Sequence, residues 1–419
     1  MHKLKLSLLS LLSLLMLSMP YQAMSQRNEI LDDNIASLQV MNGTDWQSLL
    51  PIITLNSSDV VNISFDNFNQ QYHRYTYKIE HCESDWSVST QLFSSDYVTG
   101  FSEGIPIEDI SQSVNTNVEY SHLSFSIPNE KCNIKLSGNY QVTVVDEDDN
   151  NRPILVAHFM VAEPLMNIGM SYRTNTDIDI NSTHQQVDLS LSYNNVSVTN
   201  PDTQIKTIVM QNGRWDDARI NARPDNIMPR GMQWTHCKNY IFDAGNEYRK
   251  FEILDVSHPT MGIETTDWDG KNYNAYIWRD EPRINYLYDE DANGAYCIRN
   301  SDNNDNDRLC QYVITHFTLK TTPTDNDIYI DGAFTNNSFL PKYKMTYNPS
   351  SGFYEASILL KQGYYSYKYL VVENNGKAHD LQSEGNFFQT ENAYQCLVYY
   401  RGNGERTDRL VGFSNLKQQ

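Results

Sequence analysis

The fold class can be read from one stretch, Ile134-Lys135-Leu136-Ser137-Gly138-Asn139-Tyr140-Gln141-Val142-Thr143-Val144. It has an apolar side chain at every second position on both sides of a Ser-Gly-Asn turn. Strict alternation gives a strand one buried face and one solvated face, as in an antiparallel sheet. The same pattern recurs at Tyr75, Tyr77 and Ile79, and at Val187, Leu189, Leu191 and Tyr193. Long apolar runs with helical spacing are missing. The sequence therefore predicts an all-β chain with few, short helices.

Turn-forming residues separate these runs. Asn and Gly both tolerate positive φ, so Asn-Gly pairs predict tight turns. Such pairs stand at Asn42-Gly43, Asn212-Gly213, Asn293-Gly294 and Asn375-Gly376. The acidic segment 146–151 is expected to be a hairpin tip between strands at 140–145 and 154–161.

Three domains are expected after an export signal. Pro164 ends the first apolar block, and the polar segment 321–325 follows a predicted strand at 312–317. We expect an N-terminal immunoglobulin-like β-sandwich over 26–164, a middle β-rich domain over 165–320 and a C-terminal β-sandwich over 321–419. Each piece has roughly the 100 residues or more that a sandwich of this kind needs.

Residues 1–25 have the pattern of a secretory signal peptide. Lys3 and Lys5 precede an apolar run over 6–19, which at about 14 residues is too short to span a bilayer. Ala23 and Ser25 supply small residues at the −3 and −1 positions before Gln26. The sequence thus predicts an exported chain, with no lipid-anchoring cysteine and no later transmembrane segment.

The chain is acidic, with 32 Lys and Arg against 52 Asp and Glu, a net charge of −20 and a pI near 4.8. Loss of Lys3 and Lys5 with the signal makes this about −22. Nucleic acids and anionic lipid head groups bind clustered basic residues, and the sequence has no such cluster. These two classes of partner are therefore excluded.

Six cysteines permit disulfides in an exported protein but do not require them. The best candidate pair is Cys297 with Cys310, because these residues flank one polar loop and lie on two short apolar runs. Buried free thiols are the alternative. CxxC spacing is absent, which argues against a zinc ribbon or a thioredoxin-type motif.

The turn that contains Asp289, Asp291 and Asn293 begins like a calcium-binding loop. Its twelfth position is Asn300, which cannot supply the bidentate carboxylate, so a solvated hairpin turn is the alternative. The run over 300–307 is almost wholly Asn and Asp and is typical of a surface loop. We assign no metal and no cofactor.

Catalytic motifs are absent from the sequence. It has no H-E-x-x-H pair, no G-x-S-x-G elbow and no phosphate-binding glycine loop. We therefore expect no enzymatic activity. Aromatic side chains could line a sugar groove or a protein interface, or could simply be core residues; the candidates are Trp86, Trp215, Trp234, Trp268 and Trp278.

Several segments together resemble the periplasmic plug protein family of the type IX secretion system of Bacteroidetes. In the first block these are 75–82, 85–86, 100–101, 127–129 and 137–140. In the middle and last blocks they are 245–252, 288–294, 352–355, 359–365, 384–394 and 408–412. Arg249, within the second set, could bind a partner or form an internal ion pair.

The last block also resembles the glycogen- and starch-binding type of β-sandwich, in the segments 331–335, 352–355 and 363–369. Such modules usually stack sugars on exposed Trp. No Trp follows Trp278, so we expect the scaffold without the sugar platform.

The resemblance to the plug family implies a non-enzymatic protein of the periplasm. It would dock on the periplasmic opening of the outer-membrane type IX translocon barrel (SprA/Sov-like) and seal it in the absence of cargo. The barrel, and not lipid, would hold it at the inner face of the outer membrane, and no small-molecule substrate is expected. The alternative is an exported carbohydrate-binding or carbohydrate-processing protein. The sequence does not show which residues bind a partner.

Overall fold

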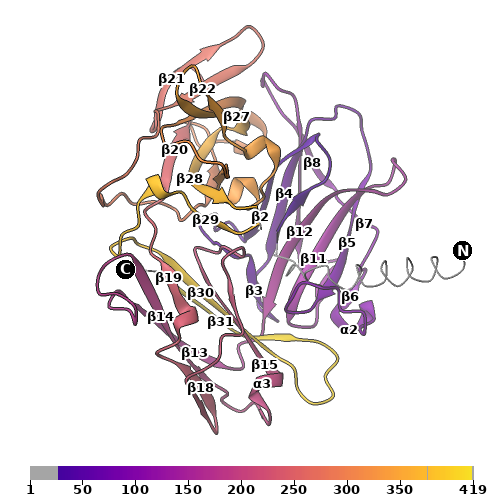
Figure 1. The fold of residues 1–419 in the computed structure, drawn as a ribbon. Coiled ribbons are helices and arrows are strands. Elements are labelled where there is room, and N and C mark those ends of the chain that lie inside the picture. The colour runs from indigo at the N-terminus through magenta and orange to yellow at the C-terminus, as the bar shows by residue number, and fades with distance from the viewer. Residues whose placement is uncertain (1–26, 375, 418–419) are drawn as a thin grey trace, which may run out of the picture.

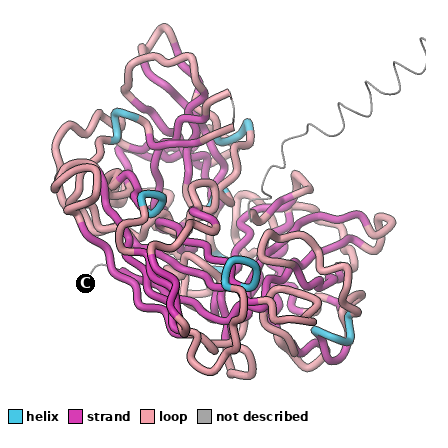
Figure 2. Tube along the Cα trace, turned by 60° about the horizontal axis from the view of Figure 1, so that its bottom comes forward, coloured by secondary structure: helices cyan, strands magenta, loops and turns pink. Residues whose placement is uncertain are grey.

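A computed structural model describes residues 27–374 and 376–417, and strands dominate both ranges (Figures 1 and 2). The predicted signal peptide lies outside the described residues. Within them each α-helix has only four residues: α2 (Ser94–Tyr97), α3 (Pro201–Gln204) and α4 (Asn306–Leu309). The prediction of an all-β chain with short helices is confirmed.

The first sandwich contains two antiparallel sheets and a small ribbon. One sheet has the order β1 (Glu29–Ile30), β12 (Arg152–Ala162), β11 (Gly138–Asp146), β5 (Tyr75–Cys82) and β7 (Ile105–Pro106), with β3 (Ile52–Thr54) parallel to β12. The other has the order β2 (Ile35–Asn42), β4 (Val61–Asn67), β9 (Ser121–Ile127) and β8 (Asp109–Gln112). The ribbon pairs β6 (Val98–Gly100) with β10 (Cys132–Ile134). As the alternation predicts, Tyr140, Val142 and Val144 point into the core, and β11 pairs with β12 across the acidic tip.

The second sandwich also has two sheets. The first has the order β13 (Asn167–Arg173), β14 (His184–Ser192), β18 (Gly231–Trp234) and β17 (Asn226–Met228), with β19 (Ile241–Asp243) also on β14. The second has the order β16 (Arg219–Ile220), β15 (Ile205–Gln211), β30 (Ala393–Tyr400) and β31 (Arg409–Lys417). Two of its four strands thus come from the C-terminal end of the chain.

The third sandwich is built around β28. In one sheet β28 (Gly363–Val372) pairs with β20 (Arg249–Ile253), β23 (Tyr296–Ile298), β25 (Asp327–Asp331) and β29 (Ala378–Asp380). The other sheet has the order β21 (Ile263–Trp268), β22 (Tyr273–Ile277), β24 (Tyr312–Leu319), β27 (Phe353–Lys361) and β26 (Thr346–Asn348). The β21–β22 hairpin projects from the body of the molecule (Figure 1).

This pairing corrects the predicted boundary at 320/321. The third sandwich runs from β20 to β29 and is inserted into the second, because β30 pairs with β15 across nearly 200 residues of sequence. The polar segment 321–325 connects β24 to β25 and so joins two sheets of one sandwich. Alternation in the sequence indicates strands but does not identify the distant strand with which each one pairs, so it does not predict the insertion.

Burial on both faces distinguishes the β15–β30–β31 sheet from the others. All eight residues of β30 are buried. On one face Cys396 and Val398 pack into the core of the second sandwich. On the other face Leu397 and Tyr399 join an apolar cluster with residues of the first sandwich, including Met160 of β12. The first two sandwiches therefore share a continuous apolar interface.

A buried ion pair joins the first sandwich to the third. Lys361 Nζ of β27 lies 2.7 Å from Asp66 Oδ2 of β4, and the two side chains are 2% and 1% exposed. Tyr312 donates a hydrogen bond to the same carboxylate oxygen at 2.7 Å, and His122 Nδ1 lies 2.7 Å from the other oxygen. The Lys361 ammonium also lies over the ring of Tyr120. Every oxygen of Asp66 thus has a partner, as a buried charge requires.

Lys361→Met tests this interface. Removal of one partner leaves the Asp66 charge buried and uncompensated, so we expect the free energy of unfolding to fall by about 3–5 kcal/mol. Chemical denaturation measures the change. Lys344→Met is the matched control, because its ion pair with Asp327 is exposed and its loss should hardly change the free energy of unfolding. Equal effects of the two substitutions would contradict the interpretation.

His158 supplies a pH-sensitive element at the interface between the first and second sandwiches. The imidazole of His158 is buried against Trp86, with ring centroids 5.1 Å apart. Burial disfavours the charged form and lowers the pKa of His158 to about 4. The unfolded chain binds a proton near pH 6.5 and the folded chain does not, so stability present at neutral pH is lost as the pH falls from 6.5 towards 4.

His158→Gln should remove this dependence. Between pH 7 and pH 5 the native protein should lose about 2 kcal/mol more unfolding free energy than the variant. Denaturation curves at the two pH values measure the difference. His236→Gln is the control, because His236 is exposed and its substitution should not remove the pH dependence that His158 provides. A variant that keeps the full pH slope would contradict the assignment.

Candidate functional site

The first and second sandwiches are also joined by a buried polar network beside their apolar interface. Asp408, just before β31, accepts hydrogen bonds from Lys206 at 2.8 Å and from Ser84 Oγ at 2.7 Å. Arg401 bridges Asp408 and Glu83. Although burial acts in the opposite direction, the hydrogen bonds from Lys206 and Ser84 keep the pKa of Asp408 below its usual value. The network therefore holds Asp408 ionised.

Arg214 joins the second sandwich to the third, whereas Arg249 pairs within the third sandwich and with the segment that follows β29. Arg214, which follows β15, pairs with Asp380 of β29 at 3.2 Å and with Asp216 at 2.6 Å. Arg249, at the start of β20, pairs with Asp280 at 2.8 Å and with Glu384 at 3.1 Å. Of the two roles predicted for Arg249, the structure shows the internal ion pair. All three sandwiches are thus joined to one another by charged groups, of which Asp408 and Arg214 are buried and Lys206 and Arg401 are partly exposed.

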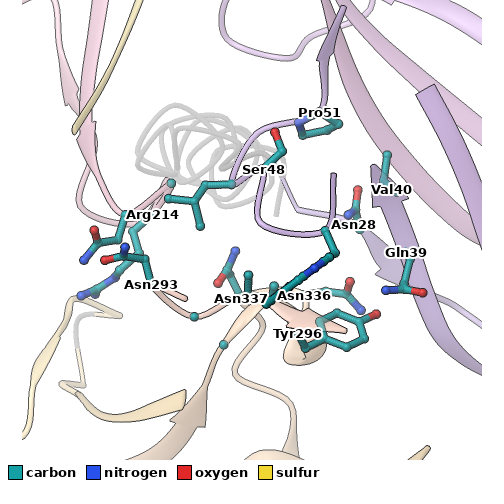
Figure 3. Close-up of a pocket in the computed structure, with 18 of the residues that line it drawn as sticks. Asn28, Gln39, Val40, Ser48, Pro51, Arg214, Asn293, Tyr296, Asn336 and Asn337 are labelled. Carbon is teal, nitrogen blue, oxygen red and sulfur yellow. The ribbon is translucent and has the colours of Figure 1, made fainter. Parts of the chain in front are cut away.

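A pocket of about 110 Å³ lies where the three sandwiches meet (Figure 3). We call it the junction pocket. Its wall is mostly polar and comes from turns of all three sandwiches. The polar side chains that line it are Arg27, Asn28, Gln39, Ser48, Asn212, Arg214, Asn293, Asp331, Asn336 and Asn337.

The predicted Asn-Gly turns build part of this wall. Asn212 and Gly213 both have positive φ, and so do Asn293 and Gly294. A side chain at Gly294 would stand 2.9 Å from the ring of Tyr248, so the turn and the ring can approach only without one. The sequence thus located two turns of the pocket. It gave no signal for Arg214 or Asp331, which become neighbours only through the insertion of the third sandwich.

Asp331 is the unusual group in the junction pocket. It ends β25 and is 3% exposed. Burial raises the pKa of Asp331 to about 6, although the nearby Arg214 guanidinium acts in the opposite direction.

A second feature is an exposed apolar surface on two loops at the seam between the second and third sandwiches. We call it the two-loop rim and define it by Ile178, Ile180, Ile284, Leu287 and Tyr288. All five are at least half exposed, and Ile284 and Leu287 are more than 80% exposed. Segment 386–390 lies between the loops: Phe388 N donates to Ser182 O at 3.1 Å, and Tyr286 donates to Gln389 O at 3.2 Å. Both loops therefore contact the same segment of the chain.

The predicted cysteine pair is close in space but unbonded. Cys310 is buried and Cys297 is half-buried, and all six cysteines are free thiols in this structure. Burial raises the pKa of Cys310 to about 12, with the neighbouring Cys297 among the smaller causes. The pairing of Cys297 with Cys310 remains a prediction.

The turn with calcium-loop spacing has its carboxylates directed apart. Asp289 is exposed and pairs with Lys250 at 2.6 Å. Asp291 instead accepts backbone hydrogen bonds from Tyr248 and Asn293. In the run over 300–307, Asn300, Asn303 and Asn306 bond mainly to one another and to local backbone, as in a surface loop.

One cluster among the described residues has the composition of a metal site. The ligand atoms of His73, Asp146 and Asp148 lie within 4.8 Å of one another at the β11–β12 tip. His73 Nδ1 already hydrogen-bonds to Asp146 at 2.5 Å, and Asp148 accepts from Arg74 N at 2.7 Å. These ligand atoms are satisfied within the protein.

The five candidate tryptophans divide into two classes. Trp86, Trp215 and Trp234 are buried and belong to the core. Trp268 and Trp278 are exposed, but they stand at opposite ends of the β21–β22 hairpin. They therefore do not form a continuous platform for a sugar.

The three sandwiches and their buried junctions place the chain in the all-β class. The family model "Type 9 secretion system plug protein 1st domain" matches residues 35–163. A hypothetical protein from Parabacteroides merdae, known from a crystal structure, is 37% identical to this chain. The two structures superpose with a TM-score of 0.90 over 94% of this chain and 99% of the other.

The chain belongs to the type 9 secretion system plug protein family, as its sequence resemblance predicts. No protein with a curated description matches it. In the part of the chain that the structure describes, no helix combines the length and apolarity needed to cross a bilayer.

Oxidation in the exported protein should link Cys297 to Cys310, since an oxidising compartment favours disulfides between neighbouring thiols. We expect a cross-linked peptide from these two cysteines in a non-reducing digest, detected by mass spectrometry. Cys82, Cys132, Cys237 and Cys396 serve as internal controls and should be alkylated only after unfolding. Alkylation of Cys297 and Cys310 as free thiols in protein kept under oxidising conditions would refute the pairing.

Proposed function

We propose that this protein docks on the periplasmic opening of the outer-membrane translocon barrel of type 9 secretion and seals it when no cargo passes. Family membership is the observation that carries the proposal. The family suggests a periplasmic location near the outer membrane and is not known for enzymatic activity. The protein would act without catalysis, through its surface alone.

The buried junctions support a sealing role. A plug must keep a fixed shape to cover an opening. Domains that moved independently would open gaps through which solutes could pass. Here the ion pair of Lys361 with Asp66, whose side chains are 2% and 1% exposed, joins the first sandwich to the third. A sheet that is buried on both faces joins the first sandwich to the second. Breaking such contacts is costly, so the three sandwiches should move as one body.

The two-loop rim is the proposed docking surface. Contiguous exposed apolar side chains mark protein contacts more often than isolated ones do. Charged residues such as Asp289 and Glu290 flank the rim, which gives an apolar centre and a polar edge. That composition suits a contact that forms and dissociates repeatedly, in contrast to the larger apolar surfaces of obligate complexes.

Pull-down of the tagged protein from gently solubilised outer membrane tests docking. We expect a very large β-barrel protein to co-purify, and deletion of this protein to make the outer membrane permeable to solutes that normally stay outside. Failure to recover a barrel under gentle conditions would contradict docking.

A double substitution, Ile284→Asp with Leu287→Asp, tests the surface. Two carboxylates in the centre of an apolar contact should reduce barrel recovery at least about tenfold, since each desolvated charge costs more than 1.4 kcal/mol. The control is Ile227→Asp with Met228→Asp on β17, whose side chains are 54% and 45% exposed. This strand pairs with β18, which in turn pairs with the C-terminal half of β14. Loss of recovery with both pairs would place the contact elsewhere.

A further inference from the structure

Strand β13 forms one edge of the first sheet of the second sandwich. It pairs with β14 over all seven residues of 167–173 without a shift of register, and no other described strand pairs with it. Residues 167–172 include no charged residue and no proline. Edge strands are usually protected by charges, prolines or bulges, because an unprotected edge pairs readily with another chain. β13 lacks all three.

The other long edge strands are protected. The registers of β2 and β21 shift at 36–39 and at 263–265. The register of β31 shifts at 410–412, and its edge is covered there, because Leu165 N donates to Val411 O at 2.9 Å. Of the described edge strands with six or more residues, β13 is the one that is both continuous and uncovered along its whole length.

Hydrogen bonds on the far side of β14 fix the direction of its main-chain groups. Tyr193 N donates to Arg230 O at 3.0 Å, and Ala244 N donates to Thr183 O at 2.9 Å. Combined with the registers of β14 against β18 and β19, both bonds assign the odd-numbered residues of β14 to β18 and β19. The even-numbered residues of β14 therefore direct their N–H and C=O groups towards β13.

The same alternation fixes the open edge of β13. Gly169 and Ser171 stand opposite even-numbered residues of β14, so their main-chain groups point towards β14. The N–H and C=O groups of Ile168 and Met170 then point the other way, out of the sheet edge. No hydrogen bond from another described segment reaches them. The edge thus presents donors and acceptors in the spacing that an added strand needs.

The core-facing side chains of β13 are also incompletely covered. Ile168, Met170 and Tyr172 pack against the core of the second sandwich but are only partly buried. The apolar core-facing side chains of the neighbouring β14 are at most 2% exposed. A strand beside β13 with apolar residues at every second position would cover the three side chains. Main chain and side chains therefore fit the same kind of occupant.

We propose that β13 pairs with an extended segment of the translocon, which adds a strand to this sheet when the protein docks. The inference rests on the proposed function and names how the contact is made. β13 leads directly into the loop with Ile178 and Ile180 of the two-loop rim, so the added strand would continue the proposed docking surface. Strand addition draws its affinity from main-chain hydrogen bonds, and alternate side chains give the specificity.

The net charge favours this occupant over a second copy of the chain. Two copies that paired through β13 would bring together net charges of −20 each, and their repulsion opposes the pairing. A neutral or basic segment of another protein meets no such repulsion. The added strand is therefore expected to be poor in acidic residues, with apolar side chains at alternate positions.

Met170→Pro tests the pairing. Proline removes the outward N–H of residue 170 without removing a donor from the ladder to β14, and edge strands tolerate proline in that orientation. Ile227→Pro is the matched control. It lies on β17 at the opposite edge of the same sheet, where its register against β18 also directs the N–H outward.

Barrel recovery in the pull-down from gently solubilised outer membrane is the first readout. Met170→Pro should reduce it about tenfold, because a carbonyl of the added strand is left without a donor. Ile227→Pro should leave it unchanged. Hydrogen exchange of the native complex is the second readout and keeps the test decisive if Met170→Pro does not fold. The amides of Ile168 and Met170 should exchange at least about tenfold more slowly in the complex than in the free protein, and those of 226–228 should not change.

Three results would overturn the proposal, each in a different way. If the native protein recovers the barrel but β13 gains no protection and Met170→Pro recovers it fully, docking stands and strand addition is wrong. If the native protein recovers no barrel, both docking and strand addition are wrong. If the purified protein sediments as a dimer that Met170→Pro dissociates, the edge belongs to a second copy.

Discussion

The structure depends on one sheet that is buried on both faces. In β15 and β30 successive side chains point in opposite directions, yet both directions are apolar: Val398 faces the second sandwich and Leu397 faces the first. A sheet in this position cannot lose either neighbour without exposing a full apolar face to water. Two of its strands, β30 and β31, come from the end of the chain, and the other two, β15 and β16, come from the middle. The chain therefore cannot complete the second sandwich until the third has been formed or passed over.

Charged groups fix the remaining interfaces. An ion pair joins the first sandwich to the third, through Lys361 and Asp66, and another joins the second to the third, through Arg214 and Asp380. At the interface of the first and second sandwiches, Asp408 pairs with Lys206. Buried ion pairs give little net stability compared with apolar packing, but the loss of one partner leaves a buried charge unpaired and is strongly destabilising. Their effect here is geometric, because each pair fixes how two sandwiches meet. A protein that covers an opening needs this fixed shape, and the proposed seal follows from it.

The same geometry creates the junction pocket. Three sandwiches that meet at one point cannot fill it completely, and the turns that line it are rich in Asn because several of their residues require positive φ. The amide groups are thus a by-product of turn chemistry. The Asp331 carboxylate is different, because turn formation does not need it. It lies at the end of β25, near the Arg214 guanidinium.

The sequence by itself determined the local structure and the family. Period-2 alternation identified β5, β11 and β14, because side-chain direction in a strand depends only on neighbouring residues. Asn-Gly pairs located turns for the same local reason. Tertiary structure decided which strands pair, and it moved β30 and β31 into the second sandwich, against the boundary expected at 320/321. It also showed Arg249 in an internal ion pair, three tryptophans in the core, and Asp331 beside Arg214 at a distance of more than 100 residues in sequence. Pairing across such distances depends on the total burial of the folded chain, and no local pattern encodes that quantity.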